Sequence, residues 1–194
     1  MTGVQTCALP IYLLYDGEFQ TDRAKQLLAL VTTELEHRGA EVSKHAIERD
    51  ELQFCRGCFD CWTKTPGECI MKDGIAEINR ACMTSDVVVY LCPIVFGQFS
   101  ANMKSAIDRW LPNMLPFFET RKDGSTMHPR RYESYAKQIM IGYAENLSED
   151  DAQLFVDITQ KHRSNVTMLI DRGNDAELAD VLRTISLERV GGSL

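Results

Sequence analysis

Four of the seven cysteines in this 194-residue chain lie in one short segment, CRGCFDCWTKTPGEC at 55–69. They are Cys55, Cys58, Cys61 and Cys69, spaced as C-x2-C-x2-C-x7-C. Four thiolates this close could hold an iron–sulfur cluster, bind zinc, form disulfides, or remain as free or redox-active thiols. Structural zinc sites usually draw on two separated C-x2-C pairs, so three cysteines in one run suit zinc less well.

A cluster and a set of free thiols make different demands on this segment. For a cluster, the turn at 66–67 could bring Cys69 back to the other three cysteines, and basic side chains could offset the negative charge. These basic side chains are Arg56, Lys64 and Lys72. Against a cluster, the large rings of Phe59 and Trp62 crowd the loop. We therefore expect free or redox-active thiols and no metal site, with a [4Fe–4S] cluster on the four cysteines as the alternative.

Composition and charge restrict the partners of the chain. Its 21 Lys and Arg against 28 Asp and Glu give a net charge of −7, which argues against a nucleic-acid partner. No apolar run approaches the roughly 18–20 residues of a membrane span, and no signal peptide is readable. Clustered cysteines in such a chain point to a reducing compartment. We expect a cytoplasmic protein without a membrane partner.

The first eleven residues, MTGVQTCALPI, differ in character from the rest of the chain. Reverse-translated with GTG as the start codon, they resemble a common sequencing-library adapter. We predict that residues 1–11 are a translated adapter, that Cys7 plays no part in the cysteine site, and that the true N-terminus is missing. Residues 12–194 are then expected to form a single domain.

Strand-like and helix-like segments alternate along that domain. Apolar runs typical of buried strands occur at 11–15, 41–47, 86–97, 138–145 and 166–171. Helical spacing of apolar residues follows them at 24–35, 75–82, 101–111, 150–162 and 178–185. Strict alternation predicts an α/β fold, a doubly wound five-stranded parallel sheet with helices on both faces. The expected strand order is the flavodoxin-like 2-1-3-4-5, with Cys82 and Cys92 in the core.

In such a sheet, ligands bind beyond the carboxyl ends of the strands, at the switch in strand order. Three loops reach this position: 16–23, 93–99 and 142–148. The cysteine loop leaves the second strand at the same end, so we expect the cysteines to lie beside this mouth. The irregular stretch 113–136 is long enough to be functional or to lie at an interface.

Two segments carry a resemblance to a known family. CRGCFDCWTKTPGECIMKDG, followed by SDVVVYLCPIVFGQFSANMKSAIDRWLP, resembles the NADPH-dependent FMN reductases, which have a flavodoxin-like fold. The likeness runs from residue 12 to about residue 145. The compact cysteine run is also similar to that of the iron–sulfur flavoproteins, a branch of the same fold whose cysteines hold a [4Fe–4S] cluster.

The resemblance implies a set of FMN-binding residues. In the family, one loop wraps the flavin ring; here it corresponds to Pro93, Ile94, Val95, Phe96 and Gly97. The third loop, with Gly142 and Tyr143, would approach the flavin edge. The phosphate would lie on the first loop, on Gly17, Gln20, Thr21 and Arg23. Three acidic residues there oppose a phosphate: Asp16, Glu18 and Asp22.

The function that follows is an FMN-dependent NAD(P)H oxidoreductase that passes electrons to a small-molecule acceptor. The flavin carries the chemistry, so no catalytic side chain is expected. The resemblance also implies a homodimer, in which 113–136 would cover the partner's flavin. Two alternatives stay open: an iron–sulfur electron carrier, and a flavodoxin-like binding module that has lost FMN. We expect His128, Arg130 and Arg131 to face solvent, with acid–base and nicotinamide-phosphate roles as alternatives.

Overall fold

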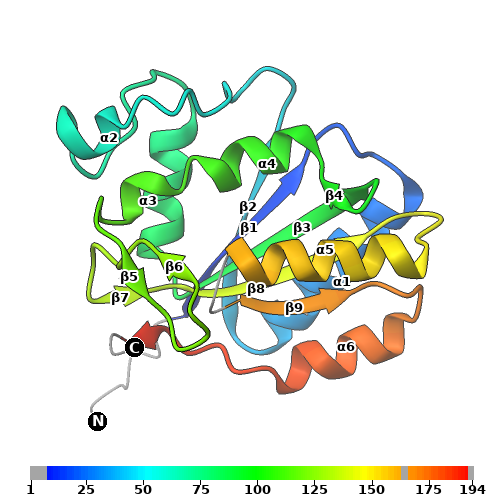
Figure 1. Ribbon diagram of the computed structural model, residues 1–194. Coiled ribbons are helices and arrows are strands. Elements are labelled where there is room, and N and C mark those ends of the chain that lie inside the picture. The colour runs from blue at the N-terminus through cyan, green and yellow to red at the C-terminus, as the bar shows by residue number, and fades with distance from the viewer. Residues whose placement is uncertain (1–7, 163–165, 192–194) are drawn as a thin grey trace, which may run out of the picture.

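A computed structural model, which describes residues 8–162 and 166–191, has a twisted parallel sheet at its centre (Figure 1). Its strands are β1 (Leu9–Asp16), β2 (Ala40–Ile47), β3 (Val87–Val95), β8 (Lys137–Tyr143) and β9 (Val166–Ile170). They lie in the order β2-β1-β3-β8-β9, and each pair of neighbours is parallel. The predicted flavodoxin-like order 2-1-3-4-5 is therefore confirmed.

Helices cover both faces of the sheet. On one face α1 (Asp22–His37) and α6 (Asp175–Thr184) pack together, and on the other lie α3 (Ile75–Thr84), α4 (Ala101–Asp108) and α5 (Glu149–His162). Alternate residues of each central strand serve the two cores, so Leu13 faces α1 while Leu14 faces α3 and α4. This two-sided burial explains why the strands read as continuous apolar runs.

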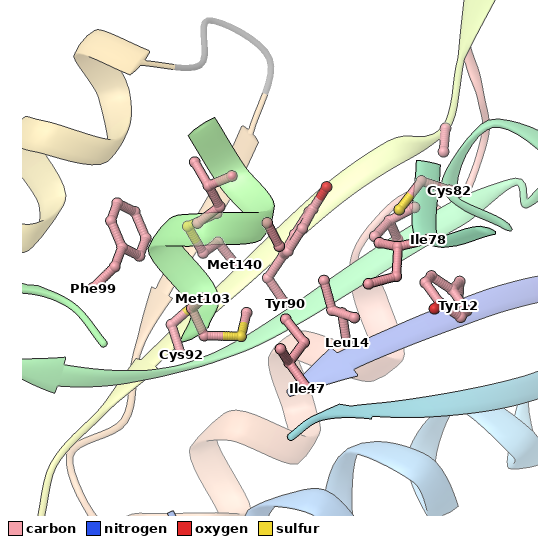
Figure 2. Packing of buried hydrophobic residues seen from close by; sticks show 14 of the residues in the cluster. Tyr12, Leu14, Ile47, Ile78, Cys82, Tyr90, Cys92, Phe99, Met103 and Met140 are labelled. Atoms are coloured by element: carbon pink, nitrogen blue, oxygen red, sulfur yellow. The ribbon is translucent and has the colours of Figure 1, made fainter. Parts of the chain in front are cut away.

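Figure 2 shows the core beneath α3, α4 and α5. Tyr12, Leu14 and Tyr90 project from the sheet toward Ile78 and Met103 of the covering helices. Cys82 and Cys92 lie within this core, at 1% and 0% exposure, as predicted.

Several short helices and strands lie outside the central sheet and its covering helices. The cysteine segment contains α2 (Asp60–Thr63), and β4 (Gln98–Phe99) folds back on the end of β3. The stretch 113–136 is more regular than expected, because β5 (Glu119–Thr120) and β6 (Thr126–Met127) form a hairpin. After η1 (Leu111–Asn113) and that hairpin, β7 (Ser134–Tyr135) pairs with β10 (Val190–Gly191).

Strand β1 begins before the point expected from its apolar run. Leu9 pairs with Ala40, and Ile11 pairs with both Val42 and Val87 at 1% exposure. The end of the segment assigned to an adapter therefore lies within the sheet, whereas residues 1–7 are outside the described residues. The adapter origin stays a prediction. Among the described helices, none is long and apolar enough to span a membrane.

Candidate functional site

The loop after β1 lies at the carboxyl edge of the sheet, as predicted, and hydrogen bonds within the chain hold its backbone. The N–H of Gly17 donates to the carbonyl of Ile47 at 2.9 Å, and the N–H of Glu18 donates to Asp16 at 3.0 Å. The side-chain amide of Gln20 donates to the carbonyl of Gly17 at 2.7 Å. Two backbone donors that a phosphate cradle would use are therefore engaged within the loop itself.

The helix that follows this loop has a regular start. Thr21 is the N-cap of α1, and its hydroxyl accepts a hydrogen bond from the N–H of Ala24 at 3.2 Å. The guanidinium of Arg23 bonds instead Asp171, in the loop after β9, and, at 2.6 Å, Asp175 at the start of α6. The hydrogen bond to Asp171 is the main reason that the pKa of Arg23 is raised. Its charge is thus already balanced by two carboxylates.

Carboxylates surround the turn at Gly17. Asp16 is only 2% exposed and accepts hydrogen bonds from Ser100 Oγ at 2.5 Å and Asn102 Nδ2 at 2.9 Å. A Cβ on Gly17 would lie 2.7 Å from a carboxylate oxygen of Glu48, so this exposed carboxylate lies directly beside the turn. A dianionic phosphate would meet Glu48 at this position in addition to Asp16, one of the acidic residues predicted from the loop itself. Sequence reasoning did not find Glu48 or Asn102.

The loop predicted to wrap a flavin ring is a tight hairpin between β3 and β4. Phe96 and Gly97 form its two-residue turn, both with positive φ (49° and 69°), which suits the right-handed twist of the flanking strands. A Cβ on Gly97 would lie 2.6 Å from Leu154 of α5, so a side chain there is excluded. Pro93 and Ile94 are buried within the sheet.

Phe96 is 89% exposed at the tip of this hairpin, and Val95 beside it is half-buried. Of the five residues predicted for the ring, only these two have side chains that are not buried.

The third predicted loop begins with two packed residues. A Cβ on Gly142 would lie 2.7 Å from Phe155 and 2.9 Å from Ile94, so Gly142 allows α5 to approach the sheet. Tyr143 is 3% exposed, and burial, followed by the nearby Asp16 carboxylate, raises the pKa of its hydroxyl. Beyond them, residues 144–148 line an open hollow of about 690 Å³ at the carboxyl ends of β8 and β9.

The four clustered cysteines converge on one small cavity of about 20 Å³, which Arg109 also lines. Burial raises the pKa of the Cys61 thiol, and the neighbouring thiols of Cys69, Cys55 and Cys58 raise it further. All four are free thiols in the structure. Among the described residues, no group of three or more His, Cys, Asp or Glu side chains is placed to hold a metal ion.

Of the two rings expected to crowd the cysteine loop, Phe59 lines the cavity and Trp62 lies outside it. Phe59 stacks on Trp62, with ring centroids 5.3 Å apart and planes at 9°. Trp62 turns outward, and its indole N–H donates to the carbonyls of Leu111 at 3.1 Å and Met114 at 3.0 Å. It therefore anchors the loop to η1.

Arg109 is a fully buried cation behind the cysteines. It forms an ion pair with Asp73 and donates hydrogen bonds to Cys69 Sγ and the carbonyl of Gln53, each at 3.1 Å. Burial alone would lower the pKa of Arg109, but its bonds to Asp73 and Cys69 outweigh this effect and raise it. Burial likewise pushes the pKa of Asp73 upward, but hydrogen bonds from Arg109 and from backbone N–H groups lower it overall.

The four clustered cysteines do not lie beside the mouth of the sheet, so this prediction is wrong. Ser100, before the start of α4, bonds Asp16 at the mouth, whereas Arg109, after its end, bonds Cys69. The helix separates these ends by about 12 Å, because its eight residues rise about 1.5 Å each. The loop after β2 runs back alongside α4 before it reaches α2, so α2 and β4 lie beyond opposite ends of α4 (Figure 1).

Two residues of the 113–136 stretch that were expected to face solvent are engaged with the protein. The ring of His128 packs against Trp62 and Phe118, at centroid distances of 4.7 and 4.6 Å. Arg131 donates to the carbonyl of Pro112 at 2.8 Å. The expectation of free, solvated side chains is therefore wrong for both.

Part of the chain matches a known protein family in sequence. Residues 17–121, more than half of the chain, match the family described as NADPH-dependent FMN reductase. An iron–sulfur flavoprotein of Archaeoglobus fulgidus is 37% identical over 89 residues, which cover 46% of this chain and 40% of that protein. One from Methanocaldococcus jannaschii is 32% identical over 75 residues, 39% of this chain and 37% of that protein. The aligned part thus spans about two-fifths of these relatives.

Solved structures share the fold at low sequence identity. An NAD(P)H:quinone oxidoreductase from Methanothermobacter marburgensis superposes with a TM-score of 0.63 at 14% identity, covering 91% of this chain and 96% of its own. An azoreductase from Bacillus anthracis gives 0.63 at 13% identity, covering 91% and 99%. These likenesses extend the fold assignment over the whole sheet.

Proposed function

Because the chain belongs to the NADPH-dependent FMN reductase family, we propose that it is an FMN-dependent NAD(P)H oxidoreductase that passes electrons to a small-molecule acceptor. The observation that carries this proposal is the exposed hairpin at 93–97, which extends from β3 beside the switch between β1 and β3. Bound FMN would supply the hydride and electron chemistry, and the protein would supply position and electrostatics.

The two ends of the proposed FMN site differ in how well they fit the cofactor. The ring end fits well, since Phe96 offers an aromatic face and the turn at 96–97 offers backbone groups for the polar flavin edge. The phosphate end offers the N-terminus of α1 with its Thr21 cap, a favourable position for an anion. Asp16 and Glu48 oppose it, so we expect FMN to bind reversibly and to be lost in part during purification.

An absorbance spectrum of the purified protein, followed by titration with FMN, tests this proposal. Phe96→Ala should weaken FMN binding about fivefold, because an aromatic contact contributes about 1 kcal/mol beyond its buried area. Phe54→Ala is the matched control, since Phe54 is also highly exposed, at 73%, but precedes the cysteine loop. A protein that ignores added FMN and does not oxidise NADPH would favour a binding module that has lost its flavin.

We also propose that the chain acts as a homodimer in the cytoplasm. Phe117 and Phe118 are 65% and 72% exposed on the 113–136 stretch, and burying both would favour association. Free thiols on an exposed loop suit a reducing compartment. The double substitution Phe117→Asp and Phe118→Asp should yield a monomer in analytical ultracentrifugation. An unchanged sedimentation coefficient would argue against this interface.

The cysteine cavity supports a second candidate, an iron–sulfur electron carrier. Four cysteines line one small cavity, and the two relatives described above are iron–sulfur flavoproteins. The packing argument against a cluster also weakens, because Trp62 turns outward to η1. Iron and acid-labile sulfide should be assayed on anaerobically reconstituted protein beside a Cys58→Ser variant. About four irons per chain, lost in the variant, would favour this candidate. Free thiols throughout would favour the flavin reductase alone.

A further inference from the structure

A cavity of about 510 Å³ opens between the end of α4 and the 113–136 stretch. This volume falls within the range of about 300–1,000 Å³ that small-molecule sites occupy. Much of the wall is apolar or aromatic, and it is formed by Ile107, Trp110, Leu111, Met114, Tyr135 and Ala136. The proposed flavin loops do not line this space, and of the cysteine segment 55–69 only Cys55 and Gly57 line it.

The cavity lies at the opposite edge of the sheet from the proposed flavin loops. Its lining residues Ala136 and Gln138 stand at the start of β8, whereas the strand reaches the mouth at Tyr143. Seven strand residues span about 20 Å. A ligand in this cavity is therefore distinct from a flavin ring on the hairpin at 93–97.

Three cationic side chains line the cavity, although the chain as a whole carries a charge of −7. They are Arg121, Arg130 and Lys161. Arg121 Nε donates to Met127 Sδ at 2.9 Å, and the Arg130 guanidinium lies 5.3 Å from the centre of the Tyr135 ring. Within residues 8–162 and 166–191, the ion pairs include no carboxylate partner for Arg121 or Lys161.

The acidic member of the lining is already paired. Asp108 accepts from Lys104 Nζ at 2.5 and 2.6 Å, so its charge is balanced within α4. Asp123, which interacts electrostatically with Arg121, is exposed and does not line the cavity. Cationic groups on an apolar wall whose acidic member is already paired complement a ligand that has a flat apolar body and a negative end. The aromatic walls at Trp110 and Tyr135 suit a ring in that body.

We propose that this cavity binds an aromatic organic anion, with its ring against Trp110 and Tyr135 and its acidic group held by Arg121 and Lys161. The cavity shares Cys55 and Gly57 with the cysteine site, so the ligand would also cover one thiol of that loop. Cys58 is also exposed but lines the small cavity and not the large one. A ligand in the large cavity should therefore protect the thiol of Cys55 and leave that of Cys58 accessible.

The test uses 8-anilinonaphthalene-1-sulfonate as the anionic probe and N-phenyl-1-naphthylamine, the same ring system without the sulfonate, as its neutral match. Probe fluorescence is titrated on the full chain in the presence of saturating FMN. We expect binding of the sulfonate at one site per chain, and Arg121→Gln should weaken it about tenfold through loss of a charge-assisted contact. Lys122→Gln, next in sequence and exposed, should leave it unchanged.

A blocking variant and a thiol-protection assay also test this binding site. Thr126→Trp, at a lining position on the exposed hairpin, should block both probes while circular dichroism stays native. The sulfonate should slow alkylation of Cys55 and leave Cys58 unaffected. Equal weakening in Arg121→Gln and Lys122→Gln, displacement of the probe by FMN, or equal affinity for the neutral probe would overturn the proposal.

Discussion

The guanidinium of Arg109 lies between Asp73 and Cys69, paired with the carboxylate of one and donating to the sulfur of the other at 3.1 Å. This contact ties the end of α4 to the cysteine loop and to the turn before α3. A buried cation needs such partners, because an unpaired charge in a low-dielectric interior is costly. The relationship therefore fixes where the fourth cysteine of the run can lie.

Removing the carboxylate partner should destabilise the fold strongly. We expect Asp73→Asn to lower the free energy of unfolding by about 3–5 kcal/mol, because it leaves a buried cation without its counter-charge. Urea denaturation at pH 7 measures this loss. Asp180→Asn is the control, since its ion pair with Arg183 is exposed, and it should change stability by less than about 0.5 kcal/mol. Equal small effects in both variants would contradict the proposed role of the Arg109 pair.

The same pair predicts how stability depends on pH. The pKa of Asp73 is lowered in the folded state, so the unfolded chain binds its proton more readily. The contribution of Asp73 is therefore fully present above its unfolded pKa of about 3.9 and is lost as pH falls through the lower folded value. Urea midpoints between pH 7 and pH 3 should fall more steeply in the parent protein than in Asp73→Asn. Parallel curves would show that Asp73 does not contribute.

The sequence predicted the sheet well because burial on both faces leaves long apolar runs. Strand β3 and the strand order followed directly from that pattern. Contacts between distant residues could not be read in the same way. Asp16 and Ser100 are 84 positions apart, and neither residue alone indicates their hydrogen bond.

The cysteine loop shows a second limit of sequence reasoning. The position where a loop leaves the sheet does not determine its later path, and this loop turns back along α4 to Arg109. The hairpin at 93–97 was placed correctly at the sheet edge. Its positive φ at Phe96 has no signal in the sequence, because non-glycine residues rarely adopt it.

The thiols should differ in reactivity according to their burial. The thiolate is the nucleophile, and burial raises the pKa of Cys61 above its ordinary value. Cys61 should therefore alkylate more slowly than the exposed Cys55 and Cys58 at pH 8, and its rate should keep rising at higher pH. Differential labelling with iodoacetamide, read by mass spectrometry, measures this order. Cys61 reacting as fast as Cys58 would contradict it.

A bound cluster would change that pattern in a recognisable way. All four thiols of the loop would then be protected together, and a chelator would release them together. Cys82 and Cys92 serve as references, because both lie in the core and should react only when the chain unfolds.

The acidic groups around Gly17 should make FMN binding weaker than the ring contacts alone would give. We expect Glu48→Gln to tighten FMN binding about fivefold, because it removes a negative charge within a few ångströms of the proposed phosphate position. Riboflavin has the same ring without the phosphate, so its affinity should not change in this variant.

The control variant is Glu41→Gln, which alters an exposed carboxylate near the amino end of β2 and should affect the binding of neither ligand. For the same reason, raising salt should strengthen FMN binding to the parent protein by screening the repulsion. Isothermal titration with both flavins distinguishes these cases, and equal changes for FMN and riboflavin would show that Glu48 does not act through the phosphate.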